Sequence, residues 1–163
     1  MKNIDETAIL PFANSINTTE DLFRLIEQLE GLQRYLYKGK AGYLSVKALE
    51  FLSPDVSKIF KEIESLGLEP IEEDKQMDFV DSLIRFLRNI TVLKMTVAYI
   101  PTEAFTAKVS GDVSKQFGKK VILELSVDES VVGGAAFEFL GKYANYTYGA
   151  NVTKFVDNFW KAS

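Results

Sequence analysis

The side chains of this sequence that could do chemistry are carboxylates, lysines, tyrosines and hydroxyls, because its 163 residues include no histidine and no cysteine. Thiolate nucleophiles, imidazole bases, Ser-His-Asp triads and Cys/His zinc sites are therefore excluded. The densest group of carboxylates is Glu72, Glu73 and Asp74. Adjacent side chains point apart and do not converge on a metal ion or a reacting atom, so this group is predicted to belong to a solvated acidic linker over residues 69–75.

Two pairs of glycines and one acid complete the candidate sites. Gly39 and Gly42 flank a lysine but lack the G-x-x-x-x-G-K-[ST] spacing that cradles phosphate, so a loop is predicted there. Gly133 and Gly134 could bind an anion through their backbone N–H groups, but no clear helix start follows them. The better interpretation is that two residues without a Cβ let the backbone take positive φ or approach a neighbouring element closely before the hairpin. Asp128 follows a strand without an identifiable catalytic partner, which favours a turn or a cap. We predict no catalytic residue, metal site, cofactor or small-molecule substrate.

The composition of the chain excludes further classes of protein. The net charge is −4, the pI is about 5.0 and 47% of the residues are hydrophobic, which is typical of a soluble globular protein. Scattered lysines in an acidic chain do not favour a nucleic-acid surface, and the aromatic residues after position 143 are interpreted as packing and protein contact. No run approaches the roughly 20 apolar residues of a membrane helix, and the first 16 residues lack a signal or transit pattern. We expect no membrane insertion.

Apolar residues recur every three or four positions through the first half of the chain, which is the period of amphipathic helices. Buried helical stripes are predicted from Leu22 to Leu36, from Val56 to Leu66 and from Val80 to Ile90, and a short helix is predicted over residues 44–52. Thr18 or Thr19 is suited to cap the first of them, with acids in the turn that follows. Ser53-Pro54-Asp55 is a strong helix start, and Gly67 is a plausible helix end.

The period changes to two near Thr91, which indicates strands. Strands are predicted over residues 93–99, 121–127, 135–140 and 143–147, and a last amphipathic helix over residues 152–159. The third and fourth strands form a hairpin across Gly141-Lys142. A helix between the first two strands begins at Pro101-Thr102 and ends at Gly118. Its buried stripe is predicted to be Phe105, Val109, Val113 and Phe117.

These elements predict an α+β fold with two parts. An all-α helical bundle over residues 1–91 precedes a small β-α-β-β-β-α domain over residues 92–163. Each core is thin at this size, so stabilisation by a partner protein is expected.

The segment between the second strand and the hairpin reads V-D-E-S-V-V-G-G. It resembles a motif of the delta subunit of F-type ATP synthase, called the oligomycin-sensitivity-conferring protein in mitochondria: V-D-x-S, two hydrophobic residues, then G-G. The matching positions are Val127, Asp128, Ser130, Gly133 and Gly134. At the positions where that family has the tripeptide D-G-S, this chain has Asn145-Tyr146-Thr147. Polar residues stay at Asn145 and Thr147 but the middle glycine is lost, so a different turn is expected there.

Three shorter segments are similar to the same family. Residues 117–121 read F-G-K-K-V, which resembles the segment that leads into a strand in the family. Residues 97–103 are similar to the family's V-x-x-A-x-P-L-[ST]-x-E segment in a compressed form, with one residue fewer before the proline. Residues 11–16 are similar to the R-P-Y-A-x-A-L opening of its first helix, with Leu10 in place of the arginine. The helical part is short for the family, so one helix is expected to be reduced or absent.

The resemblance implies a non-catalytic subunit of the peripheral stalk, the stator of the ATP synthase. The helical domain would bind the N-terminal segments of alpha subunits on top of the catalytic head, and the second domain would bind the end of the b subunit. This joint resists rotor torque during proton-driven ATP synthesis. The implied location is the cytoplasmic face of a bacterial inner membrane, where partner proteins hold the subunit peripherally.

Under this resemblance, partner-binding side chains are predicted in a groove between the first and last helices of the bundle. The predicted groove walls are Phe12, Ala13, Ile16, Val80, Ile84 and Leu87. The alternative is that all six belong to the core of the bundle. The competing function is an α+β binding module with an unknown partner. A small enzyme is the third possibility, and it would need ionisable groups that converge in one cleft.

Overall fold

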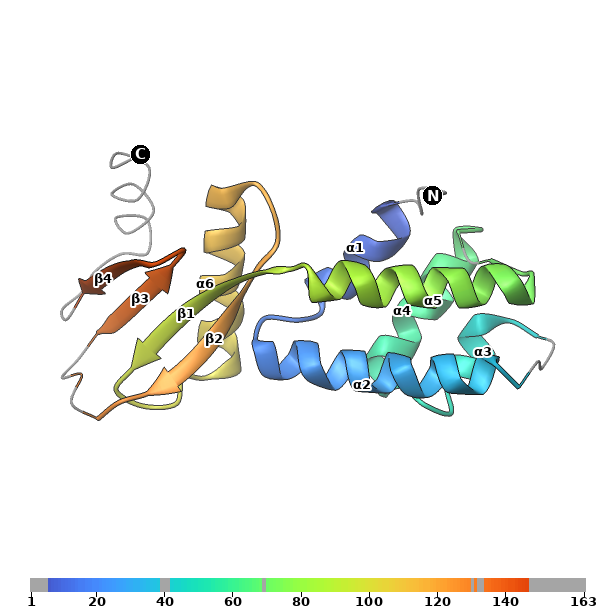
Figure 1. The fold of residues 1–163 in the computed structure, drawn as a ribbon, viewed down its shortest axis with the longest axis horizontal. Coiled ribbons are helices and arrows are strands. Elements are labelled where there is room, and N and C mark those ends of the chain that lie inside the picture. Colours follow the sequence, from blue (N-terminus) through green and yellow to red (C-terminus); the bar gives the residue numbers. More distant parts are fainter. Residues whose placement is uncertain (1–5, 39–41, 69, 130, 132–133, 147–163) are drawn as a thin grey trace. The chain divides into compact units, whose positions relative to one another are not determined.

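The computed structural model describes residues 6–38, 42–68, 70–129, 131 and 134–146, and it confirms the predicted α+β fold. Helices occupy the first part of the chain, and a four-stranded mixed sheet with one helix follows (Figure 1). The chain divides into two compact units: a helical unit of residues 1–16 and 22–89, and a sheet unit of residues 17–21 and 90–163. That residues 1–91 and 92–163 are separate domains stays a prediction.

The described part of the helical unit contains five helices. They are α1 (Glu6–Asn14), α2 (Thr19–Leu36), α3 (Leu44–Ala48), α4 (Pro54–Ser65) and α5 (Glu73–Arg88). The apolar stripes predicted for α2, α4 and α5 face the core, where Leu29, Phe60 and Leu83 are fully buried. The stripe of α4 is wrong at its last member, Leu66, which is 69% exposed because it lies beyond the end of the helix. Removing such side chains from water is the main stabilising term of a bundle. The helix predicted to reach Leu52 ends at Ala48, whose carbonyl accepts the N–H of Leu52 at 2.9 Å as the chain turns toward α4.

Two predicted helix ends are confirmed by their hydrogen bonds. At the start of α2, Thr18 Oγ1 accepts from the Asp21 N–H, and the Asp21 carboxylate accepts in return from the Thr18 N–H, both at 3.1 Å. This reciprocal pair satisfies N–H groups that a helix start leaves without partners. At the end of α4, Gly67 has a positive φ of 68° and the Leu68 N–H donates to the Ile63 carbonyl at 2.9 Å. Glycine adopts this conformation without Cβ strain.

The acidic linker predicted over residues 69–75 is wrong in its second half. Helix α5 begins at Glu73, so Glu73 and Asp74 lie in its first turn, where the positive end of the helix dipole favours carboxylates. Glu72 forms an exposed ion pair with Lys75, with 2.6 Å between Oε1 and Nζ. All three acids are exposed, and no group of three or more potential metal ligands occurs within the described ranges.

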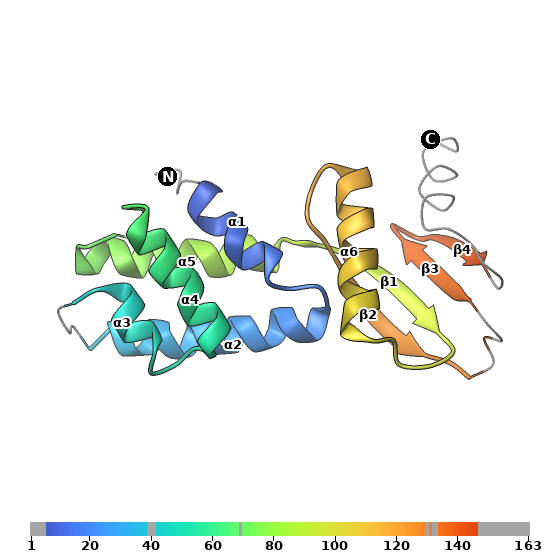
Figure 2. The ribbon, with the colours of Figure 1, turned by 180° about the vertical axis from the view of Figure 1, so that it is seen from behind.

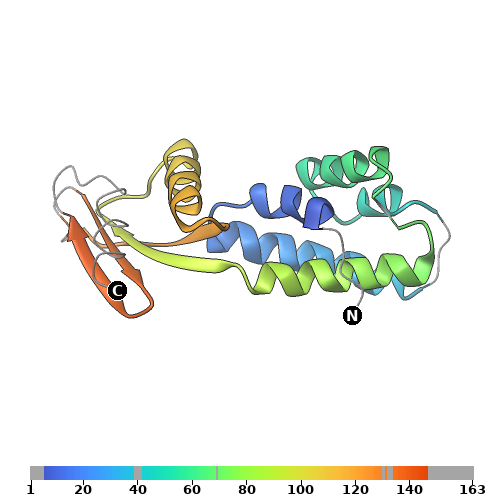
Figure 3. The same ribbon diagram turned by 90° about the horizontal axis from the view of Figure 1, so that it is seen from above.

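The sheet unit has the strand order β2-β1-β3-β4. The elements are β1 (Thr91–Val97), α6 (Glu103–Phe117), β2 (Val121–Val127), β3 (Ala135–Phe139) and β4 (Lys142–Tyr146). Strands β1 and β2 are parallel, and the other pairs are antiparallel. Helix α6 packs on one face of the sheet, over a core that includes Leu93 and Phe137 (Figure 3). On the opposite face Lys94 lies between Glu124 and Glu138, an arrangement of alternating charge that favours this register.

Helix α6 has the predicted ends but not the predicted buried stripe. Thr102 Oγ1 accepts from the Phe105 N–H at 3.3 Å at its start, and Gly118 ends it with a φ of 65°. The stripe is wrong at Phe105, which is nearly half exposed, because the helix buries Thr106 and Ser110 instead. The Ser110 hydroxyl donates to the Val121 carbonyl at 2.8 Å, so this polar side chain is buried without losing a hydrogen bond.

The predicted hairpin is present, but its turn lies one residue earlier than predicted. Phe139 pairs with Lys142, so the two turn residues are Leu140 and Gly141 and not Gly141-Lys142. Both have positive φ, 49° and 75°, as the tight turns that suit the twist of a hairpin require. The helix predicted over residues 152–159 lies outside the described residues.

Replacing Leu140 by asparagine is expected to stabilise the sheet unit by about 0.5–1 kcal/mol, because leucine is strained in a left-handed conformation that asparagine tolerates. Leu140 is the one non-glycine residue with positive φ in the described chain, and its side chain is 81% exposed, so little apolar contact is lost. Hydrogen exchange of the β3 and β4 amides measures the change. Leu140→Ala keeps the Cβ and is the control. Equal protection in the two variants would contradict the prediction.

Candidate functional site

The V-D-x-S-x-x-G-G segment begins at the last residue of β2 and ends just before β3, and residues 128–134 between these strands are called the crossover here. Val127, the last residue of β2, lies opposite Val97 on one side, and Ala135, the first residue of β3, lies opposite Val97 on the other. Seven residues, 128 to 134, therefore separate two strand ends that both lie beside the carboxyl end of β1. The Asp128 N–H donates to the Val97 carbonyl at 2.9 Å, which anchors the start of the crossover.

The motif positions within the described chain have backbone roles. The Asp128 carbonyl accepts from the Val131 N–H at 3.0 Å, which is the turn role predicted for Asp128. Gly134 has a φ of 128°, a conformation that residues with a Cβ rarely adopt, so glycine is needed where β3 begins. Asn145 lies within β4 opposite Ala136 and not in a turn. The predicted positions Ser130, Gly133 and Thr147 lie outside the described residues.

The F-G-K-K-V segment joins α6 to β2 and leads to an edge contact that the sequence did not indicate. The Leu123 N–H donates to the Asn17 carbonyl at 2.8 Å, and Thr18 forms a parallel bridge with Leu123, so residues 17–18 pair with the outer edge of β2. Lys120 Nζ lies 3.5 Å from Asn17 Oδ1. Burial lowers the pKa of the Lys120 ammonium, and the Asp21 carboxylate offsets part of this shift.

The six predicted groove residues all lie in the core of the helical unit. Phe12, Ala13, Ile16, Val80, Ile84 and Leu87 are buried. The ring of Phe60 on α4 lies between α1 and α5, with its centroid 4.8 Å from that of Phe12 and 6.5 Å from that of Phe79. The apolar faces of α1 and α5 therefore meet through α4 in the interior. A partner-binding role for the six stays a prediction, and it would require these helices to separate.

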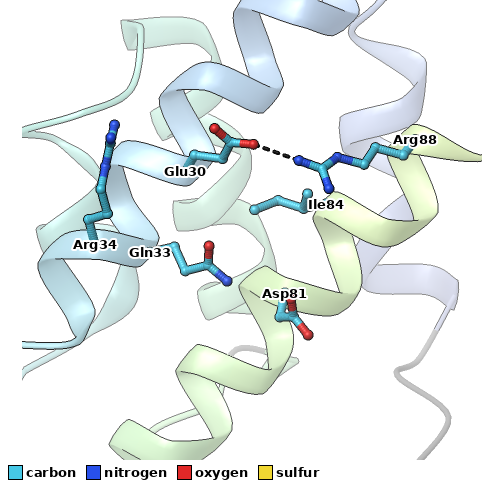
Figure 4. A pocket seen from close by; sticks show the side chains of 6 residues that line it. All are labelled: Glu30, Gln33, Arg34, Asp81, Ile84 and Arg88. Carbon is cyan, nitrogen blue, oxygen red and sulfur yellow. Dashed lines mark hydrogen bonds and ion pairs between the residues drawn. The ribbon is translucent and has the colours of Figure 1, made fainter.

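An open cleft of about 260 Å³ lies between α2 and α5 (Figure 4). Its lining residues are Glu30, Gln33, Arg34, Asp81, Ile84 and Arg88. An Arg88 guanidinium nitrogen lies 2.6 Å from Glu30 Oε1, and Asp81 pairs with Arg85 along α5. Both pairs are exposed and contribute little stability. The lining has no nucleophile held against a base, and its mixed charges are suited to polar contacts at the rim of a protein interface.

Sequence reasoning had selected only Ile84 of the residues that line this cleft. For Glu30, Arg34 and Asp81 the signal is charge spacing: Glu30 and Arg34 are four residues apart on α2, and Asp81 is four residues before Arg85 on α5. Gln33 and Arg88 have no such signal. Such spacing places two charged side chains on one helix face. It cannot show which two helices bring their charged faces together, because the partner helix is more than 40 residues away in the chain.

A comparison of the chain with models of known protein families and with curated proteins finds no match. Within the residues that the structure describes, none of the helices is both long enough and apolar enough to span a bilayer.

Proposed function

We propose that this chain is the delta-type peripheral-stalk subunit of an F-type ATP synthase, a non-catalytic stator that joins the catalytic head to the b subunit. The observation that supports the proposal most directly is the position of the V-D-x-S-x-x-G-G segment. It occupies the sequence between β2 and β3, whose end residues Val127 and Ala135 both lie opposite Val97 of β1. The F-G-K-K-V segment likewise spans the junction of α6 and β2.

The proposed mechanism is mechanical. Rotor torque would spin the catalytic head unless a stator held it, so the joint must transmit force between two partners without dissociating. The helical unit would bind the N-terminal segments of alpha subunits and the sheet unit the C-terminal end of the b subunit, at the cytoplasmic face of the inner membrane. Such a loaded joint needs broad, well-packed contacts around a few anchoring side chains. The chain has two compact units, and under this proposal each would carry one such surface.

A titration of the whole chain with two synthetic peptides tests the proposal, one from the alpha N-terminus and one from the b C-terminus of the same organism. We expect the alpha peptide to shift amide resonances of the helical unit and the b peptide to shift those of the sheet unit. Peptides with the same composition in scrambled order are the controls. A folded protein whose spectrum responds to neither peptide would overturn the proposal and favour the binding module with another partner.

A further inference from the structure

Strand β2 forms one edge of the sheet and β4 forms the other (Figure 2). Successive residues of an edge strand direct their backbone groups alternately into the sheet and away from it. The Asp128 N–H, just after β2, donates inward to the Val97 carbonyl of β1, whereas the Leu123 N–H donates outward to the Asn17 carbonyl. The odd-numbered residues of β2, 121 to 127, therefore direct their backbone groups outward.

These outward-facing positions differ in what covers them. Serine hydroxyls of α6 accept from the Val121 N–H at 2.9 Å and donate to its carbonyl at 2.8 Å. Residues 17–18 cover Leu123. Leu125 and Val127 have no outward hydrogen-bond partner within the described ranges. An edge with unpaired N–H and C=O groups can pair with the strand of another chain, so the cover at Leu123 decides how much of β2 is available.

Residues 17–18, called the edge cover here, are held by one carboxylate. Asp21 Oδ2 accepts from the Asn17 N–H and from the Thr18 N–H, both at 3.1 Å. Hydrogen bonds to a charged acceptor are stronger than those between neutral groups, so these two bonds are the main restraint on the backbone of the cover. The ammonium of Lys120 adds a weaker contact, with Nζ 3.5 Å from Asn17 Oδ1.

The β2 edge is complementary to a second copy of itself. In an antiparallel pair centred on Leu125, Leu123 lies opposite Val127 of the second copy and Glu124 lies opposite Ser126. The outward groups of all three odd-numbered residues then meet in hydrogen-bonded pairs. Val127, whose side chain is 50% exposed, gains an apolar neighbour across the pair, and no charge faces a like charge. These features select a second copy of the chain as the strand that fits this edge.

The edge cover blocks this register. Thr18 lies opposite Leu123, which is the place that Val127 of a second copy would take. Other registers are disfavoured by charge. Moving the centre by one residue places Glu124 opposite either Glu124 or Asp128 of the second copy, and like charges directly opposite each other are destabilising.

We propose that the β2 edge is a strand-pairing surface for a second copy of this chain and that the edge cover keeps it closed. The inference does not depend on the proposed function, because the cover would keep a stator subunit or any other binding module monomeric in the same way. Pairing of residues 123–127 alone makes a small contact, so the opened edge forms a weak dimer that is populated at high protein concentration.

The first test opens the cover and measures the association of the whole chain by sedimentation equilibrium. Asp21→Ala removes the acceptor of both cover N–H groups, and we expect it to dimerise at concentrations where the wild type is monomeric. In dilute solution its Leu123 amide should exchange with solvent at least about tenfold faster than in the wild type. Its Leu125 amide should become protected only as the dimer forms. Glu20→Ala is the matched control, because it removes an exposed acid from the same helical turn and keeps the Asp21 acceptor.

The second test examines the register through Ser126 in the Asp21→Ala chain. Ser126→Lys places a positive charge opposite Glu124 of the second copy, Ser126→Glu places a negative charge there, and each contact occurs twice in a two-fold dimer. Both variants lose the hydrogen bond between the Ser126 and Thr96 hydroxyls, so the difference between them reports the charge across the pair. We expect Ser126→Lys to dimerise about tenfold more tightly than Ser126→Glu.

Amide spectra establish that each variant is folded. A wild type that dimerises as tightly as Asp21→Ala would show that the cover blocks nothing and would overturn the inference. It would also be overturned by an Asp21→Ala chain that stays monomeric, or by one whose Leu123 amide exchanges no faster than in the wild type. Equal association of the two Ser126 variants would assign the dimer to another surface, such as β4, and reject the proposed register. None of these outcomes affects the binding of alpha or b peptides.

Discussion

The variant Phe60→Ala is expected to lose about 3–5 kcal/mol of the free energy of unfolding of the helical unit, the cost of truncating a fully buried phenylalanine. Phe60 contacts two other rings edge to face, Phe12 at 4.8 Å and Phe79 at 6.5 Å between centroids. It thereby joins α1, α4 and α5, and three helices border the cavity that alanine would leave. The free energy of unfolding of a small domain is about 5–15 kcal/mol, so this one substitution removes a large part of the stability of the helical unit.

Urea unfolding followed by circular dichroism at 222 nm measures this loss, because helices dominate that signal. Hydrogen exchange of the α4 and α5 amides assigns the loss to the helical unit. Phe23→Ala is the matched control, since its ring is exposed and its removal should change stability by no more than about 0.5 kcal/mol. If the two alanine variants unfolded at the same urea concentration, the central role of Phe60 in the core would be refuted.

The parts of the fold that the sequence predicted correctly depend on interactions within a few residues. The cap at Thr18 and Asp21, the start of α6 at Thr102 and the glycine ends at Gly67 and Gly118 each involve groups at most five positions apart. The stability of each of these helix ends therefore depends on residues that are close together in the sequence. The hairpin turn was placed one residue late because Leu140 occupies a positive-φ position where glycine, asparagine or aspartate is usual.

The parts that were missed depend on contacts between distant residues. An apolar stripe on a helix looks the same in sequence whether it packs in the core or awaits a partner, which is why Phe12 and Leu87 could be assigned to a groove although both are buried. The stripe of α6 was misplaced at Phe105 because periodicity counts Ser110 as polar and cannot show that the Val121 carbonyl accepts from its hydroxyl. The edge contact of residues 17–18 with β2 spans more than 100 residues.

The variant Gln76→Leu is expected to lose about 1.5–3 kcal/mol of the free energy of unfolding of the helical unit, because it leaves a buried ammonium without its hydrogen-bond acceptor. Gln76 is 0% exposed and Lys47 is 6% exposed, and among the described residues the Gln76 amide oxygen is the acceptor for the Lys47 ammonium at 2.8 Å. Leucine fills a similar volume, so loss of packing contributes little. The carbonyls of Gly42, Pro70 and Ile71 also lose a donor, but Gly42 and Ile71 are exposed and Pro70 is partly so, and water can satisfy them.

The double variant Lys47→Met/Gln76→Leu separates the unpaired charge from other causes of the loss. Replacing both partners with apolar side chains removes the buried ammonium and its missing acceptor together, so stability is expected to recover by about 1–3 kcal/mol relative to Gln76→Leu alone. Urea unfolding of the wild type, the two single variants and the double variant completes the thermodynamic cycle. A double variant no more stable than Gln76→Leu would show that the amide acts through the loop carbonyls and not through Lys47. Methionine and leucine can pack against each other between α3 and α5, where the ammonium and the amide now meet, so the double variant is expected to keep these two helices together.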